Sequence, residues 1–215
     1  MLTVWGRRDA FNVQKVLWFI GELGLEHRHI PAGGDHGGLD DPAFRAMNPH
    51  GRVPVIDDGG TVVWESHTIL RYLAARYGKD AYWSQDPGER SRAERWMDWS
   101  GTTLQPDFLT GVFWGFYRTP AEQRDTAAVA QKLARCAAHM RLLDAELATR
   151  PWLGGDRFGL ADIPAGTNLF RYFGIPIERP PVPHVEDWYR RLQERPAYRE
   201  HVMLPFDHMA GRLSY

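Results

Sequence analysis

Residues 48–77 read Asn-Pro-His-Gly-Arg-Val-Pro-Val-Ile-Asp-Asp-Gly-Gly-Thr-Val-Val-Trp-Glu-Ser-His-Thr-Ile-Leu-Arg-Tyr-Leu-Ala-Ala-Arg-Tyr. Two short runs of β-branched and apolar residues, 53–56 and 61–64, are typical of strands. Between them, residues 57–60 are aspartates and glycines, which a hairpin turn requires. From residue 66 onward, apolar residues recur at helical spacing. The stretch therefore predicts two strands joined by a turn, followed directly by a helix.

The starts of the helix and of the hairpin are both candidates for a binding surface. Ser66 stands just before the periodic run, where an N-cap residue belongs. With Glu65 it would lie at a helix N-terminus, whose unpaired N–H groups and partial positive charge attract anions. Pro54 has no N–H for a sheet, so it fits the first residue of a strand or an edge strand. The alternative is purely structural: Ser66 only caps the helix and Glu65 only ends a strand.

The order and spacing of these residues resemble the glutathione-binding half of the glutathione S-transferase family. The similar residues are Asn48-Pro49-x-Gly51-x-Val53-Pro54-Val55, Asp58-Gly59 and Glu65-Ser66-x-x-Ile69-x-x-Tyr72-Leu73. The resemblance implies a cis Val53–Pro54 bond whose backbone pairs with the cysteinyl part of glutathione. It also implies that Glu65 and Ser66 hold the γ-glutamyl ammonium and carboxylate, and that Arg52 belongs to the same site. Glutathione is thus the expected co-substrate.

The residues ahead of this motif predict a strand, a helix and a second strand. The strands are residues 2–5 and 27–30, the helix begins at Asn12, and residues 42–47 fit a further short helix. The resulting order resembles the thioredoxin-like fold. Strand–helix–strand crossovers predict a sheet that is partly parallel.

The glycine-rich segment 33–38 matches neither of the usual nucleotide-binding loop patterns. We expect a mobile loop beside the ligand. His36 within it is either a glutathione contact or a solvated loop histidine.

Beyond the first domain the hydrophobic period is helical for most of the chain. We expect a thioredoxin-like domain at 1–78, a linker at 79–88 and an all-α domain at 89–215. The predicted helices of the second domain lie near residues 88–116, 121–149, 160–173, 184–194 and 196–203. Segments 153–155 and 160–163 resemble the family's buried helix-start motif, in which Asp162 bonds back to the preceding turn.

Composition and charge argue against several functional classes. The chain has 215 residues, 43% of them hydrophobic, which is enough to bury a substantial core. A formal net charge of -1 gives no general attraction to nucleic acid or to an anionic membrane. One cysteine excludes an intramolecular disulfide framework, and no apolar run is long enough to span a membrane. The start of the chain does not resemble a signal peptide. We therefore expect a cytoplasmic protein.

The histidines and the single cysteine show neither H-E-x-x-H nor paired C-x-x-C spacing. The sequence therefore predicts no metal site.

The family's chemistry depends on a thiolate, because the thiolate and not the thiol is the nucleophile. Many members supply a Tyr or Ser hydroxyl, or a Cys, just after the first strand, whereas Ala10 stands at that place here. Asn12 matches the asparagine of a bacterial subgroup whose motif is Thr-Pro-Asn, without the threonine. We expect Asn12 to stabilise the thiolate, with Arg8 assisting. The structural alternatives are that Asn12 caps a helix beginning at Val13 and that Arg8 is solvated.

Aromatic residues gather between positions 96 and 117 and could form core or line an apolar pocket. In the family, the first helix of the second domain forms the electrophile pocket. The resemblance therefore assigns Phe113, Trp114 and Tyr117 to that pocket. Cys136, between small residues in a predicted helix, fits a packed position.

Three functions remain open from the sequence. The first is a glutathione transferase that attacks a small hydrophobic electrophile in detoxification, or a related glutathione-dependent disulfide or peroxide reductase. The second is a non-catalytic binding protein that keeps the tripeptide site, and the third is a fold used only for interactions. The resemblance also implies a two-fold homodimer, with contributions expected from Tyr72, Arg76, Arg92 and Trp96, and with Asp98 approaching the active site of the neighbouring subunit.

Overall fold

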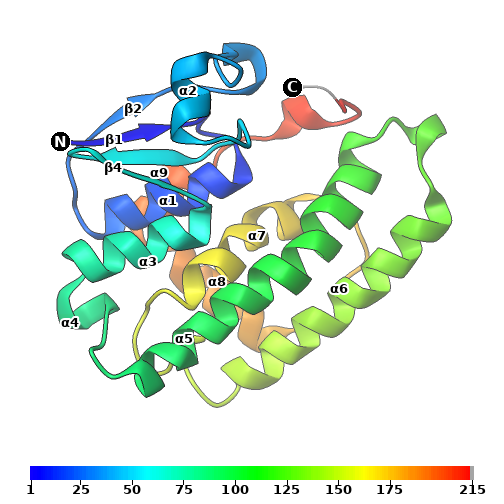
Figure 1. The fold of residues 1–215 in the computed structure, drawn as a ribbon. Coiled ribbons are helices and arrows are strands. Elements are labelled where there is room, and N and C mark those ends of the chain that lie inside the picture. Colours follow the sequence, from blue (N-terminus) through cyan, green and yellow to red (C-terminus); the bar gives the residue numbers. More distant parts are fainter. Residues whose placement is uncertain (214–215) are drawn as a thin grey trace. The chain divides into compact units, whose positions relative to one another are not determined.

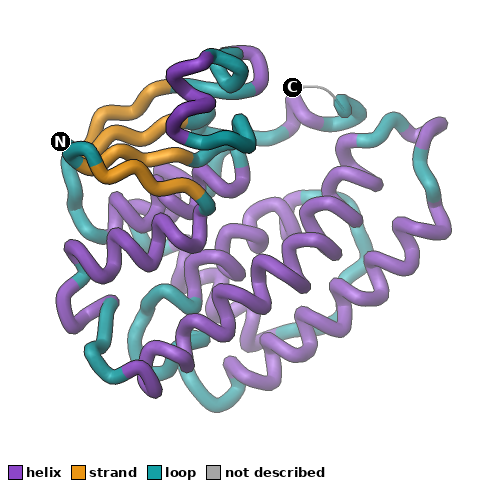
Figure 2. Tube along the Cα trace, viewed as in Figure 1, coloured by secondary structure: helices purple, strands orange, loops and turns teal. Residues whose placement is uncertain are grey.

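The computed structural model describes residues 1–213, which form two compact units (Figure 1). The first unit comprises Met1–Gln85 and Ala197–Leu204, and the second comprises Asp86–Pro196 and the segment that starts at Pro205. The first contains a four-stranded sheet with helices, and the second is mostly helical (Figure 2). The predicted fold class is confirmed. Across residues 1–213, no helix combines the length and apolar character needed to cross a bilayer.

The first unit is a mixed sheet with the strand order β2-β1-β3-β4. β1 pairs in parallel with β2 and antiparallel with β3, and β3 pairs antiparallel with β4. Figure 1 shows α1 and α3 along one face of this sheet and α2 on the other. The elements of this unit are β1 (Leu2–Trp5), α1 (Phe11–Glu22), β2 (His27–Ile30), η1 (Gly34–His36), α2 (Pro42–Met47), β3 (Val55–Asp58), β4 (Thr61–Trp64), α3 (Ser66–Tyr77), α4 (Lys79–Tyr82) and α9 (Pro196–His201).

The hairpin turn between β3 and β4 is made by Gly59 and Gly60, with φ of 62° and 98°. A two-residue turn of this kind requires left-handed backbone, which glycine adopts without steric cost. The first strand of the hairpin is predicted at 53–56 but lies at Val55–Asp58. Because Pro54 cannot donate to the sheet, pairing begins one residue later, and the strand runs directly into the glycines.

α1 is buried almost all round, because helices pack on it as well as the sheet. Gln14 Nε2 donates to the carbonyl of Val202 (3.3 Å), and the Trp18 and Tyr198 rings meet edge to face at 4.8 Å. Residues 197–204 therefore pack with the first unit, although they were expected in the domain 89–215. The expected linker 79–88 is also partly helical, since it contains α4 and the start of α5.

The second unit is built from helices, including two π-helical segments. Its elements are α5 (Pro87–Trp99), η2 (Ser100–Leu104), η3 (Pro106–Arg118), η4 (Ala121–Gln123), α6 (Thr126–Leu147), α7 (Asp162–Gly174), α8 (Pro183–Gln193) and η5 (Asp207–Met209). The helix expected near 88–116 is thus present, but η2 and η3 take the wider π turn. The helix expected at 121–149 begins only at Thr126, because the Asp125 side chain caps it by accepting from Ala128 N–H (2.9 Å).

Asp162 bonds back to the turn that precedes α7, as predicted. Its carboxylate accepts from the N–H groups of Leu153 (3.0 Å) and Gly159 (2.9 Å) and from Trp188 Nε1 (3.1 Å). Complete burial raises the pKa of Asp162 to about 7, against the opposing effect of these donors.

Cys136 on α6 is buried, as expected, and burial raises the pKa of its thiol to about 12.

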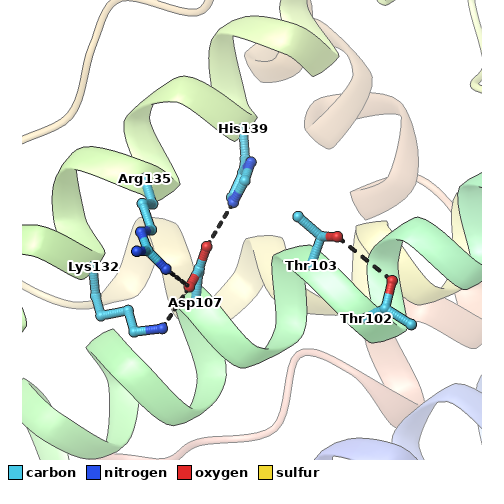
Figure 3. Close-up of polar contacts among 6 residues, drawn as sticks. All are labelled: Thr102, Thr103, Asp107, Lys132, Arg135 and His139. Atoms are coloured by element: carbon cyan, nitrogen blue, oxygen red, sulfur yellow. Dashed lines mark hydrogen bonds and ion pairs between the residues drawn. The ribbon is translucent and has the colours of Figure 1, made fainter.

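A second buried carboxylate, Asp107 on η3, ties this segment to α6 (Figure 3). It accepts from Lys132 Nζ (2.6 Å) and His139 Nε2 (2.9 Å), and Arg135 approaches to 3.7 Å. One turn away on the same helical run, the hydroxyls of Thr102 and Thr103 lie 3.5 Å apart. Burial alone would raise the pKa of Asp107, but the hydrogen bonds from Lys132 and His139 outweigh it and leave the pKa lowered.

The lowered pKa makes the stability from Asp107 dependent on pH. A carboxyl group whose pKa is lower in the folded state stabilises above its unfolded pKa, and this stabilisation is lost as the pH falls through the folded pKa. We expect Asp107→Asn to lower the free energy of unfolding at neutral pH by about 1.5–3 kcal/mol, because hydrogen bonds to a charged group are lost. The difference from wild type should shrink as the pH falls below the ordinary Asp value.

Urea unfolding of both proteins along a pH series measures this difference. Asp156→Asn is the matched control, since Asp156 is exposed in the same unit. Equal stability of wild type and Asp107→Asn at neutral pH would contradict a stabilising role for Asp107.

Candidate functional site

The strand register gathers the predicted binding residues of the first unit at one end of the sheet. Ile30 pairs with Trp5, Trp5 pairs with Val55, and Val55 pairs with Trp64. These four residues form one row across the sheet. Each of them is next to a loop or helix start that carries a predicted site residue. The row leads to η1 with His36, to the β1–α1 loop with Arg8, to Val53–Pro54 and to Glu65–Ser66. The segments that carry the first unit's candidate residues therefore converge although they are scattered along the chain.

The loop after β1 lies directly against the Val53–Pro54 segment. A Cβ on Gly6 would come within 2.4 Å of Val13 Cγ2 and 3.2 Å of Val53 Cβ, so only glycine fits there. Gly6 N–H donates to Ile30 O (3.0 Å), and His29 Nε2 donates to the carbonyl of Gly6 (2.7 Å). Burial lowers the pKa of His29, which favours the neutral ring in this bond. Gly6 thus allows the loop to approach Val53 closely.

The Val53–Pro54 peptide bond is cis, which confirms what the family resemblance implied. The preceding loop is organised by the buried side chain of Asn48. Its Nδ2 donates to Arg52 O (2.8 Å), and its Oδ1 accepts from His50 N–H (3.1 Å). Arg52 itself is exposed. The sequence motif includes Asn48 but gives no signal that its side chain holds this loop together.

The start of α3 brings Glu65 and Ser66 to the same end of the sheet, but their capping roles differ from the prediction. Glu65, not Ser66, occupies the N-cap position, and Ser66 is the first helical residue. Glu65 is exposed with φ of 67°, in the left-handed region, and its side chain does not cap the helix in the described chain. Ser66 is buried. An uncapped helix N-terminus beside a buried hydroxyl is a suitable place for an anion.

Asn12 lies in the first turn of α1, but it is not the cap. The helix begins at Phe11 with Ala10 as N-cap, so Asn12 is the second helical residue. Ala10 has no side-chain oxygen, and Arg7 pairs with Asp9 (Nε–Oδ1 3.2 Å) in the loop before it. Arg8 is exposed. Asn12 therefore does not cap α1, although it lies in the first turn at the N-terminus of that helix.

His36, the remaining predicted glutathione contact, is exposed in the short η1 turn. Among residues 1–213, no group of three or more His, Cys, Asp or Glu side chains is arranged to hold a metal ion.

A buried pair of residues that the sequence did not predict lies behind the start of α3. Lys15 on α1 is 1% exposed, and its Nζ donates to Nε2 of His67 on α3 (3.1 Å). Burial lowers the pKa of Lys15 to about 7, and the charge of Glu65 partly opposes this. Burial and the charges of Lys15 and Arg71 lower the pKa of His67 to about 2, so this ring is neutral. A helix residue within an apolar run gives no sequence signal of this kind.

The predicted pocket aromatics lie on η3 of the second unit. The rings of Phe113 and Tyr117 stack at 5.3 Å, and Tyr117 meets Phe206 at 5.4 Å. Phe113 is fully buried in the described chain. Trp114 is covered instead by the guanidinium of Arg118, 3.9 Å from its ring centre. The structure thus brings Phe113 and Tyr117 together and gives Trp114 a different neighbour.

Comparisons with known proteins match both units. Residues 5–81 match the family model described as Glutathione S-transferase, N-terminal domain, and residues 106–196 match Glutathione S-transferase, C-terminal domain. The chain is 43% identical over 207 residues to Glutathione S-transferase GstB of Escherichia coli (strain K12), covering 95% of this chain and 99% of that relative. It is 28% identical over 193 residues to the disulfide-bond oxidoreductase YfcG of the same strain, covering 86% and 87%.

A solved structure is similar over almost the whole chain. It is the theta class glutathione S-transferase from Xanthomonas axonopodis pv. citri with glutathione bound, which shares 46% identity with a TM-score of 0.89. The similarity covers 95% of this chain and 98% of that one.

Proposed function

Because the chain belongs to the glutathione S-transferase family, we propose that its first unit binds glutathione and activates the thiol for attack on a small hydrophobic electrophile. The observation that carries the proposal is the row Ile30–Trp5–Val55–Trp64, which brings the cis Val53–Pro54 segment and Glu65–Ser66 to one end of the sheet. A relative with 46% identity was solved with glutathione bound. Glutathione is therefore the co-substrate that this site fits best.

Each end of the tripeptide has a matching group in this arrangement. The backbone of Val53 pairs with the cysteinyl unit, and the exposed carboxylate of Glu65 takes the γ-glutamyl ammonium. The Ser66 hydroxyl and the first-turn N–H groups of α3 bind the γ-glutamyl carboxylate. Arg52 and His36, both exposed, are available to the remaining polar groups of the ligand.

The thiol is ionised at the N-terminus of α1. The amide nitrogen of Asn12 donates to the sulfur, and the helix terminus adds a positive field at the same place. Each unit by which the thiol pKa falls requires about 1.4 kcal/mol of preferential stabilisation of the anion. Arg8 contributes less, because an exposed charge is screened by solvent. The thiolate then attacks the electrophilic carbon, a C–S bond forms, and the leaving group departs with its electron pair.

The electrophile is small and hydrophobic, and Phe113, Trp114 and Tyr117 line its pocket on the second unit. The physiological role that follows is detoxification in the cytoplasm, with neither nucleic acid nor membrane as a partner. The net charge of -1 agrees with the absence of a polyanionic partner.

A second candidate is glutathione-dependent reduction of disulfides or peroxides. The observation that favours it is Ala10, which leaves the β1–α1 loop without the hydroxyl or thiol of conjugating members, together with the similarity to a disulfide-bond oxidoreductase. A non-catalytic glutathione-binding protein would share the same site. Turnover measured on a panel of chloroarenes, peroxides and mixed disulfides separates these functions.

Ser66→Ala tests the binding site directly. Loss of one hydrogen bond to a charged carboxylate should weaken glutathione binding by about 1.5–3 kcal/mol, measured by calorimetry. Thr68→Ala is the matched control, because it removes an exposed hydroxyl from the same turn of α3. Absence of glutathione binding by the wild-type protein would contradict the proposed function.

Asn12→Ala tests thiolate stabilisation. Removal of a hydrogen bond to the sulfur anion should raise the pKa of bound glutathione by about one to two units and lower turnover. Asn12→Asp should raise it further, because a carboxylate disfavours a neighbouring anion, and Arg8→Ala should have the smaller effect. The pKa is read from the ultraviolet absorbance of the bound thiolate. An unchanged pKa in Asn12→Ala would remove this residue from catalysis.

We also propose a two-fold homodimer in which α3 and α5 meet their copies. Tyr72, Arg76, Arg92, Trp96 and Asp98 lie on these two helices. Sedimentation velocity should give about twice the 24.7 kDa chain mass, without dissociation at micromolar concentration. A monomer mass at every concentration would refute the dimer.

A further inference from the structure

Lys15 is a buried cation for which the proposed chemistry has no role. It lies on α1 with 1% of its surface exposed, and its Nζ is 4.9 Å from the ring centre of Phe11. A buried lysine usually needs a reason, because removing an ammonium group from water is costly. This lysine points toward α3, where Nζ meets His67 at 3.1 Å.

The His67 ring works as an acceptor for this lysine. When Lys15 is charged its ammonium group can only donate, so Nε2 of the neutral His67 ring then accepts and the ring proton is on Nδ1. His67 is the second residue of α3, directly after Ser66. The bond therefore anchors the Lys15 charge immediately behind the residues proposed to bind the γ-glutamyl group.

The charged groups around Lys15 lie mainly on the α3 side. Glu65 acts on Lys15 and favours its charged form, while Arg71, one turn further along α3, acts on His67. On the other side of α1, α9 brings His201, whose pKa is lowered chiefly by burial. Glu200 opposes this shift, and the charges of Arg8, His27 and His29 add to it. The positive charge of Lys15 is thus coupled to the start of α3.

We propose that Lys15 is a positioning residue of the glutathione site, whose buried ammonium group, anchored by His67, favours the α-carboxylate of the γ-glutamyl group at Ser66 and keeps Glu65 oriented for the ammonium. This inference rests on the proposed function, because it assigns the γ-glutamyl end of the ligand to Glu65 and Ser66. It adds an electrostatic component from a residue that does not touch the ligand.

The consequence is a specific pH dependence of binding. Lys15 in the free protein has a pKa of about 7. A bound carboxylate raises that pKa, so the added affinity is fully present below the free pKa and is lost as the pH rises through the bound pKa. If binding raises the pKa by about one unit, affinity falls about tenfold across the transition.

The test compares two probes by calorimetry between about pH 6 and about pH 8.5, a range that brackets the Lys15 transition. S-methylglutathione has no thiol to titrate, and the same tripeptide with γ-aminobutyrate in place of γ-glutamate lacks only the α-carboxylate. Wild-type affinity for S-methylglutathione should fall as the pH rises, whereas affinity for the decarboxylated probe should stay nearly constant.

Lys15→Met should bind S-methylglutathione at low pH as weakly as the wild type does at high pH, with a flat profile. Arg28→Met is the control, since it removes an exposed charge from β2 in the same unit. Thermal unfolding establishes that each variant is folded. If Lys15→Met does not fold, the two-probe comparison on the wild type still decides.

Two results on the wild-type protein would overturn the inference: a flat profile for S-methylglutathione, or an equal fall for both probes. An equal loss of affinity in Arg28→Met would also overturn it, because the effect would then be one of overall charge. Absence of S-methylglutathione binding by the wild type is a different outcome, since it contradicts the proposed function itself.

Discussion

The pairing of β1 on both of its edges is the constraint on which the first unit depends. β1 is parallel to β2 and antiparallel to β3, so its carboxyl end lies beside the end of β2 and the beginning of β3. The hairpin then adds the end of β4 to the same row. Side chains have a period of two in a strand, so a shift of one residue would turn each core residue outward. In β1 the buried Leu2 and Val4 alternate with the less buried Thr3 and Trp5, so this pattern fixes the register and with it the place of the candidate site.

Buried polar side chains in each unit form hydrogen bonds that hold neighbouring segments together in a defined alignment, which hydrophobic packing alone would not provide. Asn48 braces the loop before Val53, Asp162 holds the turn before α7, and Asp107 joins η3 to α6. Each accepts or donates hydrogen bonds in a directional way, whereas apolar contacts tolerate sliding. Apolar burial thus drives each unit to become compact. A few buried polar residues then fix how particular loops are aligned within it.

Much of the first unit could be predicted from the sequence because its signals are local. β1, β2, α2 and β4 lie where residue type and spacing placed them. In the second unit, the Asp162 turn was expected from the family's helix-start motif. The end of the first unit was harder, since the packing of Tyr198 on α1 depends on residues far apart in the chain. The capping roles of Ser66 and Asn12 were wrong by one or two residues, because the backbone conformation at Glu65 and Ala10 decides where each helix begins. Lys15 gave no signal, since its environment arises only from tertiary packing.

Cys136 carries the one thiol of this chain, and its burial has a chemical consequence. A protein that works with reactive electrophiles risks alkylation of its own cysteines, and attack requires an accessible thiolate. At 1% exposure, and with burial raising its pKa to about 12, the Cys136 thiol stays protonated and out of reach. The fold therefore shields the cysteine of this glutathione S-transferase family member from modification, because its thiol is neither ionised nor accessible.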